Sequence, residues 1–305
     1  MISIQAMAVN IAIRLMAANR PDGPKDYLKE REENADKSTV EINKGVICEA
    51  LAIAGISTEK ISAAKDNGMT VLYLHGGGFT SGSAKERRWL TQALAQWHGY
   101  TCIAPDYRLS PENKWPCHIE DCYAVYRQLL ETGTDPHRLV LAGESAGGTL
   151  CLLLAMRLRD EGLTMPAGIV LFSPFTDQSG SLESHRKNIS TDQMVGEDIF
   201  KDAQYEAVFR EIPSLAYLQD PHVSPLYGDF DGLPPIFISA SDTEVLYDDS
   251  ALLYEKLKQG GHPVCFEHKH GLCHAWPTFS FLPETRSTLK KMHKFINDNI
   301  AGKGE

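Results

Sequence analysis

Hydrophobic runs alternate with stretches of helical periodicity from about residue 68 to the end of the chain. The runs predicted to be strands are 70–74, 101–104, 139–142, 168–172, 235–240 and 264–268. The stretches predicted to be helices are 85–99, 118–131, 146–160, 248–259 and 284–300. Strands that alternate with helices build a mostly parallel sheet with helices on both faces. The runs VLYLH and GIVLF are continuously apolar, which is typical of central strands buried on both sides.

Two regions interrupt this alternation, residues 1 to about 40 and about 178 to 215. The first has apolar residues at helical spacing before a helix end near Pro21: Ile4, Met7, Ala8, Ile11 and Leu15. It continues in the charged stretch KDYLKEREENADKST, and the second region holds a polar loop and the helical pattern GEDIFKDAQYEAVFREI. We expect both to be additions to a single domain of residues 1–305. The two regions could be surface additions without a function or a lid over the strand ends, and the sequence does not favour either interpretation.

The composition is that of an ordinary globular protein, with 305 residues of which 43% are hydrophobic and 23% charged. A net charge of -10 argues against nucleic acid or an anionic membrane as the main partner, because such polyanions repel it. Gln5, Asn10 and Arg14 interrupt the apolar N-terminus, which also lacks the basic start of a signal peptide. No later segment is long enough to span a bilayer. The seven cysteines include no CxxC pair, which fits free thiols, and we predict a cytoplasmic protein.

Residues 143–147 read GESAG, a G-x-S-x-G motif between the predicted strand 139–142 and the predicted helix 146–160. In this context the serine, Ser145, lies on a tight turn with its hydroxyl exposed above the sheet. The N-terminus of the following helix directs free N–H groups and the positive end of its dipole to the same place. The N–H of Ala146 is therefore a candidate donor to an oxyanion. The alternative is an ordinary serine cap at the start of a helix.

A glycine-rich loop, HGGGF at 75–79, follows the predicted strand 70–74. Consecutive glycines leave the N–H groups of Gly77 and Gly78 unshielded, so that they can approach a negative oxygen closely. An HGGG loop supplies the second half of the oxyanion hole in esterases. A phosphate-binding loop is the competing interpretation, but neither G-K-[ST] nor G-x-G-x-x-G follows.

A catalytic serine on this scaffold needs an acid and a base, in the chain order serine, acid, histidine. The late strand 235–240 leads to Asp242 and Glu244, which would face the same side on extended backbone. The last predicted strand, 264–268, begins the stretch CFEHKHGLCHAW at 265–276, which contains His270 and His274. A zinc site here would need four convergent ligands, and the spacing fits none of the usual zinc patterns, so we predict no metal.

Several motifs in this order resemble the hormone-sensitive lipase-like family of α/β-hydrolase carboxylesterases: HGGGF at 75–79, DYRLSPE at 106–112, GESAG at 143–147, DPHVSPL at 220–226 and EVLYDD at 244–249. The resemblance covers about residue 70 to the end. It implies the α/β-hydrolase fold, a mostly parallel central sheet flanked by helices, with a small helical cap formed by about 1–40 and about 178–215. It also implies a serine carboxylesterase that uses no metal and no cofactor.

The resemblance also selects an acid and a base. The family's acid lies in a [D/E]-x-L-x-D pattern that Glu244 fits, although aspartate is commoner there, and Asp242 remains the alternative. Asp248, at the end of that pattern, is expected to be structural. The family's histidine is followed after one residue by an aromatic, as in HAW at 274–276, which selects His274. His270 remains the rival base, because His-Gly also occurs in the family's loop.

The resemblance and the small size of the expected cap imply hydrolysis of short- to medium-chain acyl esters of small molecules. His274 would take the proton of Ser145, Glu244 would orient His274, and the three N–H groups named above would bind the oxyanion. Activity should fall below about pH 6, where an ordinary imidazole is protonated. The alternatives are another serine hydrolase, acting on amides, thioesters or lactones, and a catalytically silent receptor. Plant gibberellin receptors resemble this family but lack the histidine. Relatives also pair through their last strand, which leaves a homodimer open.

Overall fold

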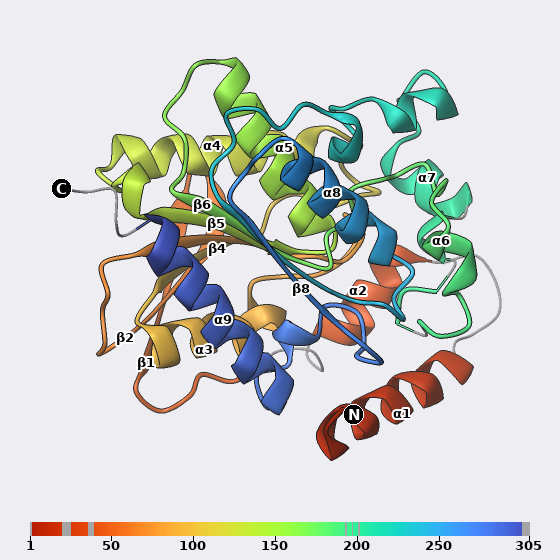
Figure 1. Cartoon of the computed structure of the whole chain (residues 1–305), viewed down its shortest axis with the longest axis horizontal. Helices are drawn as coiled ribbons and strands as arrows, with labels where there is room; N and C mark the ends of the chain where they lie inside the picture. Colours follow the sequence, from red (N-terminus) through yellow and green to blue (C-terminus); the bar gives the residue numbers. More distant parts are fainter. Residues whose placement is uncertain are drawn as a thin grey trace.

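The computed structural model describes residues 2–19, 26–35, 40–192, 194–196, 198–200 and 202–300. The described residues form one eight-stranded sheet with the strand order β1-β2-β4-β3-β5-β6-β7-β8 (Figure 1). The strands are β1 (Val46–Ile53), β2 (Ile56–Ala63), β3 (Thr70–Leu74), β4 (Thr101–Pro105), β5 (Leu139–Glu144), β6 (Gly168–Phe172), β7 (Ile236–Ser241) and β8 (Val264–Lys269). Strands β3 to β8 are mutually parallel, whereas β1 and β2 pair antiparallel with each other and β2 pairs antiparallel with β4. The sequence therefore predicted every parallel strand and missed the β1–β2 hairpin.

Helices cover both faces of the sheet, as Figure 1 shows. On one face lie α4 (Cys117–Glu131), α5 (Ala146–Asp160) and α8 (Tyr247–Gln259), and on the other lie α3 (Arg88–Ala93) and α9 (Pro283–Ile300). Consecutive strand residues alternate between the two cores: Leu72 and Leu141 pack with the α5 face, and Val71 and Val140 pack with the α9 face. Both faces are thus buried, which is why these strands are continuously apolar.

The predicted helix 85–99 is divided into three pieces, the 3-10 helix η1, α3 and the π-helix η2. The short helical turns of the described chain are η1 (Lys85–Arg87), η2 (Leu94–His98), η3 (Pro136–Arg138), η4 (Asp198–Phe200), η5 (Leu215–Gln219), η6 (Pro225–Tyr227) and η7 (Trp276–Thr278). The other predicted helices are present, with ends that differ by one residue at most.

The two interrupting regions lie on the same side of the molecule in Figure 1. The first contains α1 (Ile4–Ala18) and α2 (Tyr27–Ala35), and the second contains α6 (Ser184–Lys187) and α7 (Asp202–Val208). Helix α1 begins where the Ser3 hydroxyl accepts a hydrogen bond from the N–H of Ala6. The helix ends at Ala18 with Asn19 as its C-cap, shortly before the expected end near Pro21.

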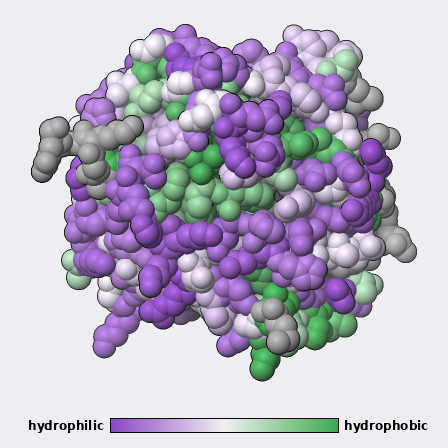
Figure 2. Space-filling model, viewed as in Figure 1, coloured by the Kyte–Doolittle hydropathy of each residue, from purple (hydrophilic) through white to green (hydrophobic). Residues whose placement is uncertain are grey.

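Helix α1 contacts the rest of the chain through a narrow face. Its buried Ala6 packs with Leu272, Trp276 and Leu282, while most of its other apolar side chains are exposed. Figure 2 shows the resulting hydrophobic patch at the lower right, where α1 lies in Figure 1. Within the described chain, no helix combines the length and the apolar character needed to cross a bilayer.

Candidate active site

Ser145 lies on the turn that joins β5 to α5, as the G-x-S-x-G motif predicts. Its φ of 54° and ψ of -123° are rare for a residue with a side chain, which marks a strained turn. The flanking glycines are required by space: a Cβ at Gly147 would lie 2.0 Å from the carbonyl oxygen of Leu74, and one at Gly143 would lie 2.6 Å from the backbone of Gly147. The turn therefore requires glycine at positions 143 and 147.

The carbonyl groups of the HGGG loop are held by hydrogen bonds. The His75 carbonyl accepts from the Tyr107 hydroxyl at 2.6 Å, the Gly76 carbonyl accepts from Nδ1 of His75 at 2.8 Å, and the Gly77 carbonyl accepts two N–H groups of the following turn. In a trans peptide the N–H points away from the carbonyl. The N–H groups of Gly77 and Gly78 therefore face away from these anchors, and neither donates to another atom of the described residues.

The loop lies directly beside the serine. A Cβ at Gly76 would lie 3.0 Å from the Cβ of Ser145. Ala146 is the first residue of α5, a position whose N–H has no partner inside a helix. Among the described residues, the N–H groups of Gly77, Gly78 and Ala146 are therefore left without partners in the loop and the helix, as the predicted oxyanion role requires.

Glu144, the variable residue of the motif, ties the loop to the serine turn. Its Oε1 accepts from the N–H of Gly76 at 2.6 Å and from Nε of Arg87 at 2.5 Å, and its Oε2 accepts from the Tyr73 hydroxyl. The side chain is buried, so the ion pair with Arg87 compensates its charge. Sequence reasoning missed this role, although the residue sits inside the motif that identified Ser145.

Of the candidate acids and bases, Glu244 and His274 form the buried pair. Nδ1 of His274 lies 2.8 Å from Oε2 of Glu244. The other carboxylate oxygen, Oε1, accepts from the N–H of Ser241 at 2.7 Å and from the hydroxyl of Ser173 at 3.0 Å. Every partner of the carboxylate can donate a proton, which fits the ionised form of Glu244. Nδ1 of His274 then carries its proton toward Glu244, and Nε2 is left for other partners.

The electrostatics of this pair favour a basic imidazole. Burial lowers the pKa of His274, but the hydrogen bond that it donates to Glu244 and the negative charge of Glu244 raise it by more, so the pKa lies above the ordinary 6.5. Burial also raises the pKa of Glu244, against the opposing effect of His274. The 2.8 Å contact between His274 and Glu244 is the physical cause of the raised pKa of His274.

The rival candidates, Asp242 and His270, contact each other instead. Nδ1 of His270 lies 3.0 Å from both carboxylate oxygens of Asp242, and the His270 side chain is 85% exposed. The expectation that Asp242 and Glu244 face the same side is wrong, because the chain does not stay extended after β7. It turns so that the N–H of Glu244 bonds to the carbonyl of Ser241 at 3.1 Å. This turn sends Glu244 inward and leaves Asp242 at the surface.

Ser145, His274, Gly77 and Gly78 line one cavity of about 450 Å³. Nε2 of His274 is buried and makes no hydrogen bond within the described chain, which includes Ser145. Hydrogen bonds between catalytic groups are often long without substrate and shorten when it binds. The cavity is therefore lined by the predicted nucleophile, the predicted base and two of the three predicted oxyanion donors, and Glu244 contacts the base.

The second interrupting region supports the loop that carries Glu244. Nδ2 of Asn188 donates to the carbonyl of Glu244 at 2.7 Å, and Oδ2 of Asp192 accepts from the N–H of Val245 at 3.0 Å. Neither residue belongs to a motif, so sequence reasoning missed both.

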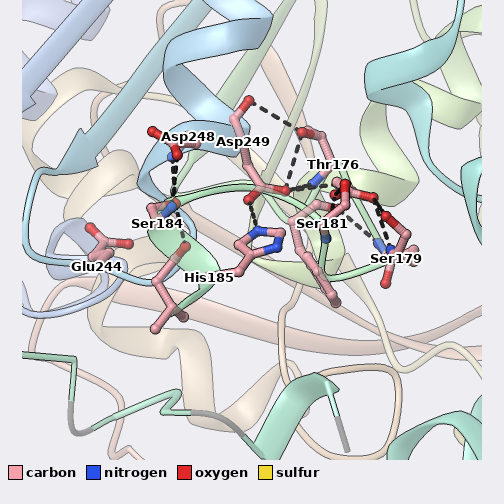
Figure 3. Close-up of polar contacts among 12 residues, drawn as sticks. Thr176, Ser179, Ser181, Ser184, His185, Glu244, Asp248 and Asp249 are labelled. Atoms are coloured by element: carbon pink, nitrogen blue, oxygen red, sulfur yellow. Dashed lines mark hydrogen bonds and ion pairs between the residues drawn. The ribbon is translucent and has the colours of Figure 1, made fainter. Parts of the chain in front are cut away.

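A polar cluster anchors the same region to the start of α8, as Figure 3 shows. The N–H of Ser184 donates to Asp248, and the Ser184 hydroxyl accepts from the N–H of Asp248. His185 contacts the buried Asp249 at 2.6 Å. Asp248 thus has the structural role expected from the sequence.

The cysteines of the chain form neither disulfides nor a metal site among the described residues. Cys273 is partly buried, and burial raises the pKa of its thiol. All seven cysteines are free thiols, as predicted. Among the described residues, no three histidine, cysteine, aspartate or glutamate side chains gather as ligands for a metal ion.

Comparison with known proteins identifies the family. The α/β hydrolase fold family matches residues 71–278. This chain belongs to that family. It is 34% identical to an acetyl-hydrolase of Streptomyces hygroscopicus over 81% of this chain and 82% of the relative, and 32% identical to an esterase of Acinetobacter venetianus over 83% and 82%. A crystal structure of an esterase from the bacterial hormone-sensitive lipase family superimposes with a TM-score of 0.89, with 30% identity over 98% of this chain and all of that one.

These relatives confirm the resemblance found in the motifs, the α/β-hydrolase fold and the enzyme class. The chain is a hydrolase of the esterase class, related to the bacterial branch of the hormone-sensitive lipase family.

Proposed function

We propose that the protein is a serine carboxylesterase in which Ser145 is the nucleophile, His274 the general base and Glu244 the acid that orients it. The observation that carries this proposal is the 2.8 Å contact between His274 and buried Glu244 at the wall of the cavity that also holds Ser145. A neutral histidine whose Nδ1–H is held by a carboxylate presents its other nitrogen as a base.

In the acylation step, Nε2 of His274 takes the proton of the Ser145 hydroxyl while Oγ attacks the ester carbonyl. Glu244 stabilises the resulting imidazolium without taking its proton. The negative charge on the carbonyl oxygen is met by the N–H groups of Gly77, Gly78 and Ala146, and losing one such donor costs about 3–4 kcal/mol in known enzymes.

The tetrahedral intermediate collapses when His274 gives its proton to the leaving alcohol. Water then repeats the sequence: His274 removes its proton, the hydroxide attacks the acyl carbonyl, and the acid leaves as Ser145 regains its proton. No step requires a metal or a cofactor, since the base and the oxyanion donors supply the proton transfers and the charge stabilisation.

We also propose that the two interrupting regions form one cap over the cavity, built from about 1–40 and about 178–215. The cavity wall supports this, because it includes Tyr27 and Arg31 from the first region and Val195, Ile199 and Gln204 from the second. A cavity of about 450 Å³ under such a cap fits short- to medium-chain acyl esters. The names of the relatives, an acetyl-hydrolase and an esterase, support small acyl groups.

A series of p-nitrophenyl esters from acetate to palmitate, assayed beside matched anilides and thioesters, tests the reaction and the chain length. We expect the highest kcat/KM for esters from acetate to octanoate. Preference for an anilide or thioester would favour the other hydrolase reactions. Tight binding of a small molecule without turnover of any activated ester would favour a receptor.

Location and oligomeric state are the subjects of two further proposals. We propose a cytoplasmic location, because free thiols are typical of a reducing compartment. We also propose a homodimer through β8, which forms one edge of the sheet. Light scattering of the purified protein at micromolar concentration measures its mass, and the mass of a monomer would contradict the dimer.

A further inference from the structure

The carbonyl of Gly78 differs from the other carbonyls of the HGGG loop. The carbonyls of His75, Gly76 and Gly77 are held by Tyr107 or by the loop itself. The Gly78 carbonyl accepts its hydrogen bond from Nε2 of Gln204, which lies on α7 in the proposed cap. This part of the oxyanion loop is therefore held by the cap.

Gln204 is itself held by the other cap segment. Its Oε1 accepts from the hydroxyl of Tyr27 at 3.2 Å, and Tyr27 is the first residue of α2. Both side chains are buried. A continuous chain of hydrogen bonds thus runs from the N-terminal segment through the insertion to Gly78, joining parts of the sequence that are far apart.

We propose that Gln204 and Tyr27 are positioning residues that fix the backbone of Gly78 on its carbonyl side, so that the oxyanion hole is complete only when both cap segments are in place. This inference rests on the proposed esterase function. It names what the cap contributes to the chemistry, beyond covering the cavity.

The backbone of Gly78 needs such support. Its φ of +60° is open to glycine at little cost, and glycine can leave it as easily because it has no side chain to restrict it. A Cβ at Gly78 would lie 3.1 Å from Nε2 of Gln204, so the amide lies directly against this residue. The peptide that carries the Gly78 N–H is oriented by the Gly77 carbonyl, and fixing the Gly78 carbonyl restricts ψ on the other side of the same residue.

The Tyr27 hydroxyl is the hydrogen-bond partner of the other end of the Gln204 amide. An amide can present either its oxygen or its nitrogen, and only the nitrogen can donate to a carbonyl. With the Tyr27 hydroxyl donating to Oε1, the Nε2 group is directed to Gly78. Without that hydroxyl, Oε1 loses the hydrogen bond from Tyr27, and the amide is held less firmly against the Gly78 carbonyl.

The test compares Gln204→Met and Tyr27→Phe with the matched controls Gln219→Met and Tyr217→Phe. Both control residues lie on η5, just after the second interrupting region, and are exposed, and neither lines the cavity. Since a buried hydrogen bond contributes roughly a factor of ten, we expect kcat for p-nitrophenyl butyrate to fall about tenfold in Gln204→Met and about threefold in Tyr27→Phe. KM should change less than twofold, and the controls should match the wild type.

Inhibition by a trifluoromethyl ketone isolates the oxyanion hole, because its adduct with a serine carries a negative oxygen. The inhibition constant should rise in Gln204→Met by about the same factor as kcat falls. The double variant should be no worse than Gln204→Met alone, because both changes break one chain. Tyr27→Phe removes a single oxygen atom, and a thermal melt checks that each variant is folded.

A kcat and an inhibition constant of Gln204→Met within twofold of wild type would overturn the positioning role and leave the esterase function standing. A loss confined to KM would overturn it equally, because it would show a contact with substrate rather than an effect on the transition state. If the wild-type protein hydrolysed no ester and did not react with a fluorophosphonate, both proposals would fall together.

Discussion

Two histidine–carboxylate pairs lie in neighbouring loops of this protein, and they differ almost only in burial. His274 and Glu244 are 2.8 Å apart, with side-chain exposures of 7% and 1%. His270 and Asp242 are 3.0 Å apart, with exposures of 85% and 36%. Water screens the exposed pair, and such surface pairs contribute little. The buried pair is out of water, and its carboxylate is fixed by two further donors.

The burial follows from the residues around each histidine. Leu272, Ala275 and Trp276 are buried beside His274, and Nε1 of Trp276 donates to the hydroxyl of Thr288. These anchors turn His274 into the molecule. His270 precedes Gly271, which offers no side chain to bury. Burial therefore distinguishes the proposed catalytic pair from the surface pair, because the contact distances in the two pairs are similar.

The largest difference in kcat/KM should be between variants of the two histidines, His274 and His270. His274→Asn should lower kcat/KM for p-nitrophenyl butyrate by about 10⁴-fold or more, because the base is lost, whereas His270→Asn should stay within about twofold of wild type. Steady-state kinetics on both purified variants measures this, with circular dichroism as a check of folding. Equal losses would remove the distinction between the two pairs.

The next largest difference in kcat should be between variants of the two acids, Glu244 and Asp242. Glu244→Gln keeps the shape but cannot hold the imidazole in the right tautomer, so kcat should fall about 10³- to 10⁴-fold. Asp242→Asn should change kcat less than about threefold, since this carboxylate is exposed and screened. A larger loss in Asp242→Asn than in Glu244→Gln would show that the surface pair is the catalytic one.

A smaller effect should come from Ser173, which belongs to the buried pair alone. Its hydroxyl donates to Glu244 at 3.0 Å and accepts from the N–H of Ala275 at 3.1 Å, so it links the acid to the residue after the base. Ser173→Ala should lower kcat about tenfold with little change in KM. Ser287→Ala, at an exposed position of α9, is the control. Wild-type kinetics in Ser173→Ala would show that the buried pair does not need this support.

The smallest effect is a shift in pH dependence. Because the pKa of His274 is raised, the imidazole is protonated, and so inactive as a base, up to a higher pH than an ordinary histidine. The acid limb of kcat/KM should therefore have its midpoint above pH 6.5, higher than the sequence alone suggests, and Asp242→Asn should leave it unchanged. A midpoint below 6.5, or one that moves with Asp242, would contradict the assignment.

The sequence predicted the parallel strands and their helices because these strands are buried on both faces and are therefore continuously apolar. It missed the β1–β2 hairpin because β1 is mostly exposed, so the run VICEALAI is not bounded by the burial that makes the central strands recognisable. Motifs located Ser145 and the loop glycines, since their chemistry depends on neighbours in sequence.

Other parts of the site could not be predicted from local patterns. The choice of Glu244 over Asp242 depended on family resemblance, because the turn after Ser241 is invisible to a strand pattern. Ser173 and Gln204 act through contacts between distant segments, and nothing in their surroundings along the chain distinguishes them from ordinary polar residues. Such contacts appear only in the folded chain.

The central claim is that His274 activates Ser145, and labelling with a fluorophosphonate tests it most directly. The wild-type protein should take up one label, on the peptide that contains Ser145, as found by mass spectrometry after proteolysis. His274→Asn should react at least about a hundredfold more slowly, while His270→Asn should react at the wild-type rate. A label on another residue, or equal rates for the two histidine variants, would contradict the account.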